Sequence, residues 1–155
     1  MEAMDIASPT RREFPSFIES AISLGILGAC AFSAGTHIAL APEHLSESTP
    51  LGLGFLAAAA LLMALGLGTF ARPYSMRLPL LIALLSAALI AAYIASRSVG
   101  LPILHPEPEP LDAVGVTTKA AELVALILSL RLYRRNAAGT ARCETQWRTR
   151  WTTIP

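Results

Sequence analysis

Four long apolar stretches constrain this 155-residue chain more than any other feature of its sequence. They cover approximately residues 16–41, 51–71, 78–96 and 113–133, and a run of about 18 or more apolar residues is long enough to cross a bilayer. Only 15% of the residues are charged, against about 25% in an average soluble domain. The runs lack the alternating pattern of barrel strands and are too long for them. The sequence therefore predicts an all-α fold, a bundle of four transmembrane helices.

Basic residues indicate how the predicted helices are oriented. Most Lys and Arg residues precede the first span, lie between the second and third, or end or follow the fourth. By the positive-inside rule these segments face the cytoplasm, which predicts a multi-pass protein of the cytoplasmic membrane with both ends inside (N-in/C-in). The expected layout is a cytoplasmic segment 1–15, a membrane domain 16–135 and a basic cytoplasmic tail 136–155. We expect this tail to be disordered rather than bound to the inner leaflet.

The first span carries a second pattern. Leu27-Gly28-Ala29-Cys30 resembles a lipobox, the site at which a bacterial lipoprotein is cleaved and acylated, and a pair of arginines precedes the span. Two observations favour an uncleaved helix instead: Glu19 interrupts the apolar region, and the apolar run continues to Ala41.

Small residues recur at helical spacing within the spans and predict the faces along which the helices pack. The three stripes are Gly25, Ala29, Ser33 and His37 in the first span, Ala83, Ala87, Ala91 and Ala95 in the third, and Glu122, Ala125 and Ser129 in the fourth.

Glu122 is the most informative residue, because an ionisable group inside a span costs at least about 2.5–3.5 kcal/mol and usually faces the bundle with a partner. Lys119, three residues earlier, His37 and Arg97 are the candidate partners. An ion pair that only fixes helix packing explains Glu122 as well as a functional site does.

All three histidines and several acidic residues fall at the predicted outer end, which suggests a polar site there. Imidazole and carboxylate groups together can bind a divalent transition metal or a small cation. The main candidates are His37, Glu43, His44 and Glu122, and the secondary ones are Arg97, His105, Glu107, Asp112 and Lys119.

Two other hypotheses stay open. The chain could be a structural or assembly subunit without a ligand, as a homo-oligomer or within a larger membrane complex. It could also be a small membrane oxidoreductase or a proton-coupled carrier. It has none of the phosphate-binding, dinucleotide-binding or nucleophile motifs of common enzymes, which favours a protein that is not an enzyme. The partner we expect is the lipid bilayer, and nothing points to nucleic acid.

The outer segments also carry a resemblance. Residues 36–47 (THIALAPEHLSE), residues 96–102 (SRSVGLP), Pro106-Glu107-Pro108 and Asp112 resemble an uncharacterised group of small four-helix bacterial membrane proteins, common in actinobacteria. The resemblance covers about Thr36 to Tyr133, although Ser48 stands where members often have an aromatic residue. It implies the same fold and topology, with recurring polar residues in the outer layer, and it implies no activity.

Overall fold

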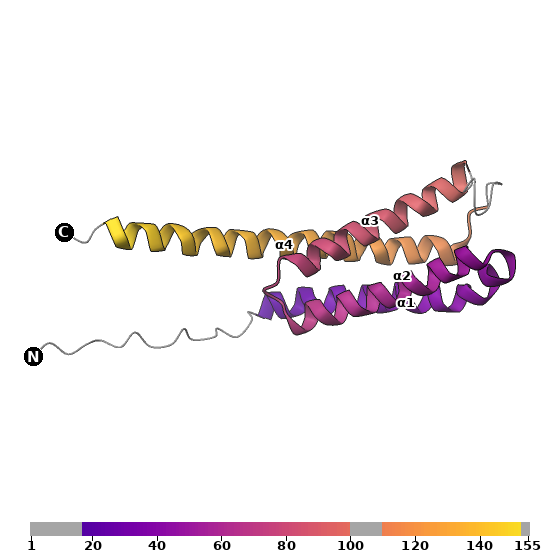
Figure 1. The fold of residues 1–155 in the computed structure, drawn as a ribbon, viewed down its shortest axis with the longest axis horizontal. Helices are drawn as coiled ribbons and strands as arrows, with labels where there is room; N and C mark the ends of the chain where they lie inside the picture. The colour runs from indigo at the N-terminus through magenta and orange to yellow at the C-terminus, as the bar shows by residue number, and fades with distance from the viewer. Residues whose placement is uncertain (1–16, 100–109, 153–155) are drawn as a thin grey trace, which may run out of the picture.

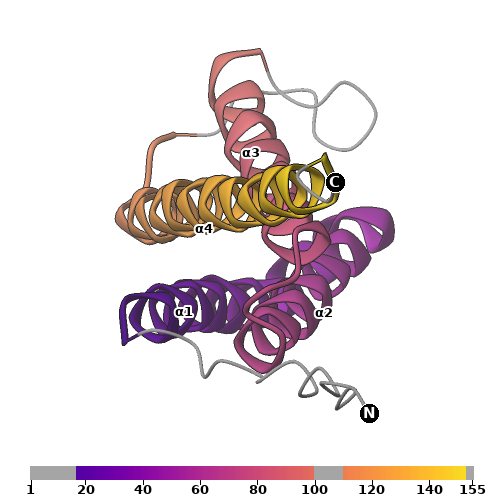
Figure 2. The ribbon, with the colours of Figure 1, turned by 90° about the vertical axis from the view of Figure 1, so that its left-hand side faces the viewer.

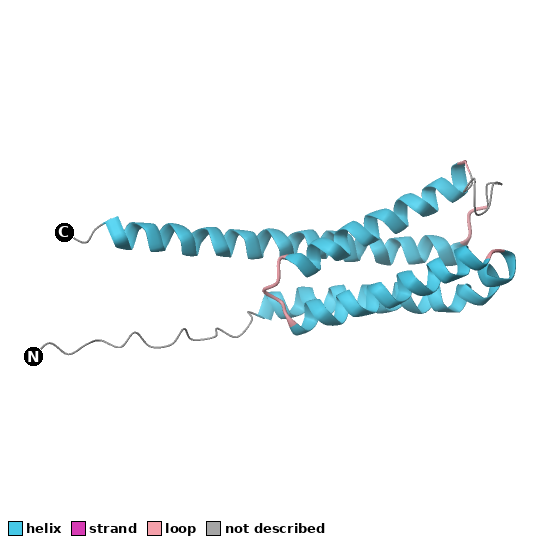
Figure 3. Ribbon diagram, in the orientation of Figure 1, coloured by secondary structure: helices cyan, strands magenta, loops and turns pink. Residues whose placement is uncertain are grey.

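The computed structural model describes residues 17–99 and 110–152, with side chains up to residue 140, and confirms the four-helix prediction (Figure 1). The helices are α1 (Phe17–Glu47), α2 (Thr49–Ala71), α3 (Arg77–Ser98) and α4 (Ala113–Thr152). Each is long and apolar enough to cross a membrane. The described part contains no strand (Figure 3). We call the end with the α2–α3 turn the inner end, and the end with Ser48 and Asp112 the outer end.

The helices form two pairs that pack unequally. Helix α1 packs against α2 and α4, and α4 also packs against α3, so that α1–α2 and α3–α4 lie on opposite sides of the bundle (Figure 2). The contact between α2 and α3 is the least extensive of the four. Toward the outer end α3 leans away from α2 (Figure 1). The bundle is therefore closed at the inner end and wedge-shaped at the outer end.

The buried core confirms two of the three predicted packing stripes. Ser33 and His37 of α1 are buried, and all three members of the α4 stripe are buried. In α3, Ala83 is buried but Ala87 and Ala91 are exposed, so the stripe prediction was wrong for the outer half of this helix. The reason is the face that α3 presents to the bundle: Ser86 is fully buried and Leu89 packs against the core, so Ala87 and Ala91 lie on a neighbouring face that points away from it.

Two predicted helix ends were also wrong. Pro42 does not close the first span, since α1 continues past it to Glu47. Proline removes one helical hydrogen bond. Pro42 lies only five residues before the end of α1, so the helix tolerates this single loss near its end. The segment expected to be a disordered tail is helical up to Thr152, because α4 continues without a break.

Polar contacts stabilise the α1–α2 connection and the α2–α3 connection. Ser48 alone separates α1 from α2, and its N–H donates to the His44 carbonyl over 2.8 Å. At the inner end, Asn136 of α4 donates from Nδ2 to the carbonyls of Pro73 (2.9 Å) and Ser75 (3.0 Å). One amide therefore satisfies two carbonyls of the α2–α3 turn and holds α4 beside it.

Candidate functional site

Glu122 lies fully buried in α4, with 0% of its surface exposed. The Lys119 ammonium, one turn earlier on the same helix, donates to both carboxylate oxygens over 2.8 and 2.7 Å. Charge-assisted hydrogen bonds of this length are among the strongest that side chains form. The first of the partners predicted for Glu122 is thereby confirmed, and the pair is formed within one helix.

Helix α1 supplies the remaining contacts of Glu122. The Ser33 hydroxyl donates to Glu122 Oε1 over 2.9 Å and joins α1 to α4. His37 Nδ1 lies 2.8 Å from the Ser33 carbonyl, which can only accept, so this ring nitrogen carries a hydrogen. The other ring nitrogen, Nε2, faces Glu122 Oε1 at 3.9 Å, which is too far for a hydrogen bond. Nε2 is thus left as the open nitrogen of the ring when His37 is neutral.

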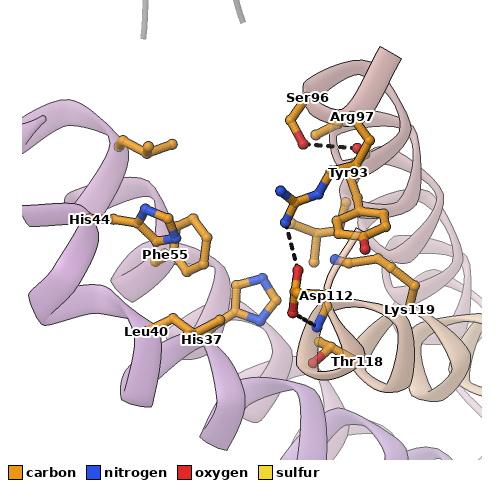
Figure 4. Close-up of a pocket in the computed structure, with 14 residues that line it drawn as sticks. His37, Leu40, His44, Phe55, Tyr93, Ser96, Arg97, Asp112, Thr118 and Lys119 are labelled. Carbon is orange, nitrogen blue, oxygen red and sulfur yellow. Dashed lines mark hydrogen bonds and ion pairs between the residues drawn. The ribbon is translucent and has the colours of Figure 1, made fainter. Parts of the chain in front are cut away.

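A cavity of about 160 Å³ lies at the outer end, next to this buried group. Figure 4 shows the α1–α2 wall, with His37, His44 and Phe55, facing the α3–α4 wall, with Tyr93, Arg97 and Lys119. The Phe55 ring contacts both imidazoles, with centroids 5.2 Å from His37 and 4.3 Å from His44. The complete lining is His37, Leu40, His44, Leu51, Phe55, Leu89, Ala92, Tyr93, Ser96, Arg97, Asp112, Gly115, Thr118 and Lys119.

An ion pair closes the rim between α3 and α4. Arg97 Nη2 donates to Asp112 Oδ2 over 2.7 Å, and Asp112 Oδ1 accepts the N–H of Gly115. Asp112 therefore caps the start of α4, where backbone donors lack helical partners. The Arg97 guanidinium also lies 4.9 Å from the centroid of the Tyr93 ring, and the Lys119 ammonium 5.7 Å from it. The Tyr93 ring is therefore within cation–π distance of both cations of the cavity.

Gly115 makes the position of Tyr93 possible. A Cβ atom at Gly115 would lie 2.6 Å from Tyr93 Cε2 and 2.9 Å from its hydroxyl oxygen, closer than real Cβ contacts. The Tyr93 hydroxyl is shielded from solvent and has no hydrogen-bond partner in the described part of the chain. The cavity wall thus holds a hydroxyl whose donor and acceptor capacity is unused.

The structure brings together only part of the predicted site. His37 and Glu122 meet, and His44 lines the same cavity while its Nδ1 lies 3.3 Å from Glu47 Oε2. Glu43 is exposed and does not line the cavity. Arg97, another candidate partner of Glu122, forms its 2.7 Å ion pair with Asp112.

A metal site is not assembled from the described residues. Among residues 17–99 and 110–140, no three His, Cys, Asp or Glu side chains form a group that could hold a metal ion. His105 and Glu107, two of the secondary candidates, lie outside the described residues.

Phe55, Tyr93 and Gly115 are the site residues that sequence reasoning missed. Phe55 lies two turns into α2, at the same depth in the bundle as His37 and His44. Matching residues of the first two predicted spans by their distance from the outer end could have revealed this. The role of Gly115 carries no such signal, because it depends on the approach of one side chain from α3.

Comparisons with known proteins add no relative. No protein-family model matches the chain, and neither a curated protein nor a solved structure is significantly similar to it. The resemblance to small bacterial membrane proteins therefore stays a prediction, and the function has to be argued from the site itself.

Proposed function

We propose that this small multi-pass membrane protein binds a compact ligand, with an apolar body and an anionic oxygen head group, in its outer cavity. The observation that carries the proposal is the division of the cavity lining. Leu40, Leu51, Phe55 and Leu89 supply apolar wall, the Tyr93 ring adds to it, and the Lys119 ammonium supplies donors. Ligand pockets typically combine apolar walls with a few polar groups of this kind.

The volume sets the size of the ligand. An engineered cavity of about 150 Å³ lined by Leu, Ile and Phe in another protein accommodates benzene, and the outer cavity is of similar size, about 160 Å³. A single aromatic ring or the end of an acyl chain is therefore the largest apolar body that fits inside it.

The charges favour an anion over a cation. The Glu122 carboxylate already accepts three hydrogen bonds and does not line the cavity. Asp112 is held by Arg97 and by the start of α4. The Lys119 ammonium has three donors, of which two are directed to Glu122. An ammonium that lines the cavity with one donor not used by Glu122, together with two occupied carboxylates, supports an incoming oxygen anion better than the metal or small cation suggested by the sequence.

The predicted orientation of the protein in the membrane indicates from which side the ligand reaches the cavity. Arg72 and Arg77 lie at the inner end and the cavity at the outer end. With the positive-inside rule, this supports a cavity in the outer half of the cytoplasmic membrane. The ligand would then reach it from outside or from the outer leaflet.

Isothermal titration calorimetry of the detergent-purified protein tests the proposal. We expect saturable binding of benzoate and weaker binding of benzamide, which has the same ring but no charge. Laurate distinguishes the source, since tighter binding of laurate than of benzoate would point to a membrane lipid rather than a soluble acid.

A pair of variants on α3 localises the binding. Ala92 lines the cavity, and Ala88, one turn earlier, is exposed and does not line it. Ala92→Phe should abolish benzoate binding by filling the cavity, and Ala88→Phe should retain it. Equal affinities for benzoate and benzamide, or equal behaviour of the two variants, would contradict the proposal.

The second candidate is a structural or assembly subunit without a ligand. It is favoured by one observation, the complete set of hydrogen bonds around Glu122, which would serve helix packing alone. Absence of binding for benzoate and laurate in the calorimeter would support this candidate.

A further inference from the structure

The charged groups around the cavity are balanced before a ligand arrives. Lys119 is paired with the Glu122 carboxylate, and Arg97 is paired with the Asp112 carboxylate. An anion bound beside Lys119 adds one negative charge without adding a positive one. Because an uncompensated charge away from water is strongly unfavourable, this imbalance favours the entry of one cation with the ligand.

We propose that binding of an anion in the outer cavity is coupled to the uptake of one proton by the His37–Glu122 pair. This inference rests on the proposed function and adds to it a stoichiometric link between ligand and proton. The atoms involved are His37 Nε2 and Glu122 Oε1, which face each other at 3.9 Å.

The geometry provides one open position for the proton. His37 Nδ1 already carries a hydrogen that it donates to the Ser33 carbonyl over 2.8 Å. A proton from solvent therefore adds to the lone pair of Nε2, forming an N–H bond that points toward Glu122. No bond breaks within the protein, and the solvent or buffer loses the proton. The imidazolium then compensates Glu122 while the Lys119 ammonium turns its donors to the ligand.

The neighbours of the pair are consistent with this role. Helix α4 contributes Lys119, which has 17% of its side chain exposed and lines the cavity. Helix α1 contributes the Cys30 thiol, which is within electrostatic range of Glu122, and the Ser33 hydroxyl. Nearer the outer end, α1 also contributes His44, which is paired with Glu47. Helix α3 places Tyr93 and Arg97 around Lys119, and α2 contributes the uncharged Phe55. Two of these groups are imidazoles that lie beside a carboxylate. His37 faces Glu122, which is fully buried, whereas the carboxylate beside His44 belongs to Glu47, which is 44% exposed and compensated by solvent.

Calorimetry in several buffers measures the coupling. Benzoate is titrated at about pH 8, where an imidazole is ordinarily neutral, in buffers with different enthalpies of ionisation. The slope of the apparent binding enthalpy against the buffer enthalpy gives the number of protons taken up. We expect about one proton per benzoate bound in the unmodified protein. Saturable binding with a slope of zero would overturn the inference and leave the proposed function standing, whereas absence of binding would overturn both.

Three variants test which residues take up the proton. His37→Gln and Glu122→Gln should each weaken benzoate binding, because the coupled proton is lost, and should reduce the slope toward zero when benzoate is raised until the variant is saturated. Glu43→Gln is the matched control, because Glu43 is an exposed outer carboxylate that does not line the cavity, and its slope should equal that of the unmodified protein. If Glu122→Gln does not fold, His37→Gln decides alone. A full proton retained in His37→Gln would refute the assignment to this pair.

Discussion

Gly52 of α2 packs closely against Leu45 of α1, and its replacement by alanine should force these helices apart. A Cβ atom at Gly52 would lie 2.7 Å from Leu45 Cα, whereas ordinary contact begins at 3.4 Å. Leu45 Cα belongs to the backbone and cannot turn aside as a side chain can. The helices would have to separate locally by about 0.7 Å, the difference between those distances.

The expected cost follows from two opposing contributions. Overpacking a tight contact typically costs about 1–3 kcal/mol, and replacing a helical glycine by alanine returns about 0.5–1 kcal/mol. Gly52→Ala should therefore destabilise the bundle by about 1–2 kcal/mol. Gly54→Ala on the same helix is the matched control, because a Cβ atom there meets nothing within 4 Å. It should be neutral or slightly stabilising.

Unfolding in mixed micelles, titrated with sodium dodecyl sulfate and followed by circular dichroism, measures both variants. Benzoate binding should weaken in Gly52→Ala as well, because Leu51 and Phe55 flank the substituted position and line the cavity. Equal unfolding free energies for the two variants, within about 0.5 kcal/mol, would refute the close approach of α1 and α2 on which this reasoning depends.

Two further substitutions test the site. Ser33→Ala removes the hydrogen bond to Glu122 and should cost about 1–2 kcal/mol of unfolding free energy in the same titration. Ser23→Ala removes a buried hydroxyl that has no hydrogen-bond partner among the described residues and should cost less. An equal cost for both would contradict the α1–α4 link. Gly115→Ala should displace the Tyr93 ring and the Asp112 carboxylate, because its Cβ atom would lie 2.6 Å from Tyr93 Cε2 and 2.7 Å from Asp112 Oδ2. We expect lower stability and loss of benzoate binding, measured by the same titration and by calorimetry. Unchanged binding would show that these two contacts do not shape the cavity.

The sequence was sufficient for the helices and for the buried carboxylate. Apolar runs of membrane-spanning length leave the backbone no other structure than helix in lipid, and all four predicted spans were found. A lone glutamate within such a run has to face the bundle, and Glu122 does. Lys119 as its partner follows from spacing, because residues three apart share a helix face.

The sequence was not sufficient for features that depend on how whole helices are inclined. Ala87 and Ala91 are exposed because α3 turns Ser86 and its neighbouring face toward the bundle, and α3 also leans away from α2 at the outer end (Figure 1). The same lean leaves the space between α2 and α3 into which Tyr93 and Phe55 project their rings (Figure 4). The choice of Asp112 rather than Glu122 as the partner of Arg97 similarly depends on where α4 begins relative to the end of α3.

The pairing of Lys119 with Glu122 within one helix also bears on how the protein enters the membrane. A charged side chain whose partner lies on another helix stays uncompensated in the membrane until the two helices associate. Here the two opposite charges lie three residues apart, at a distance of 2.7 Å, so α4 can leave the insertion machinery as an internally neutralised segment. Helices in bilayers form before they associate, and assembly of this bundle then has to add only the Ser33 hydroxyl to a carboxylate that is already compensated.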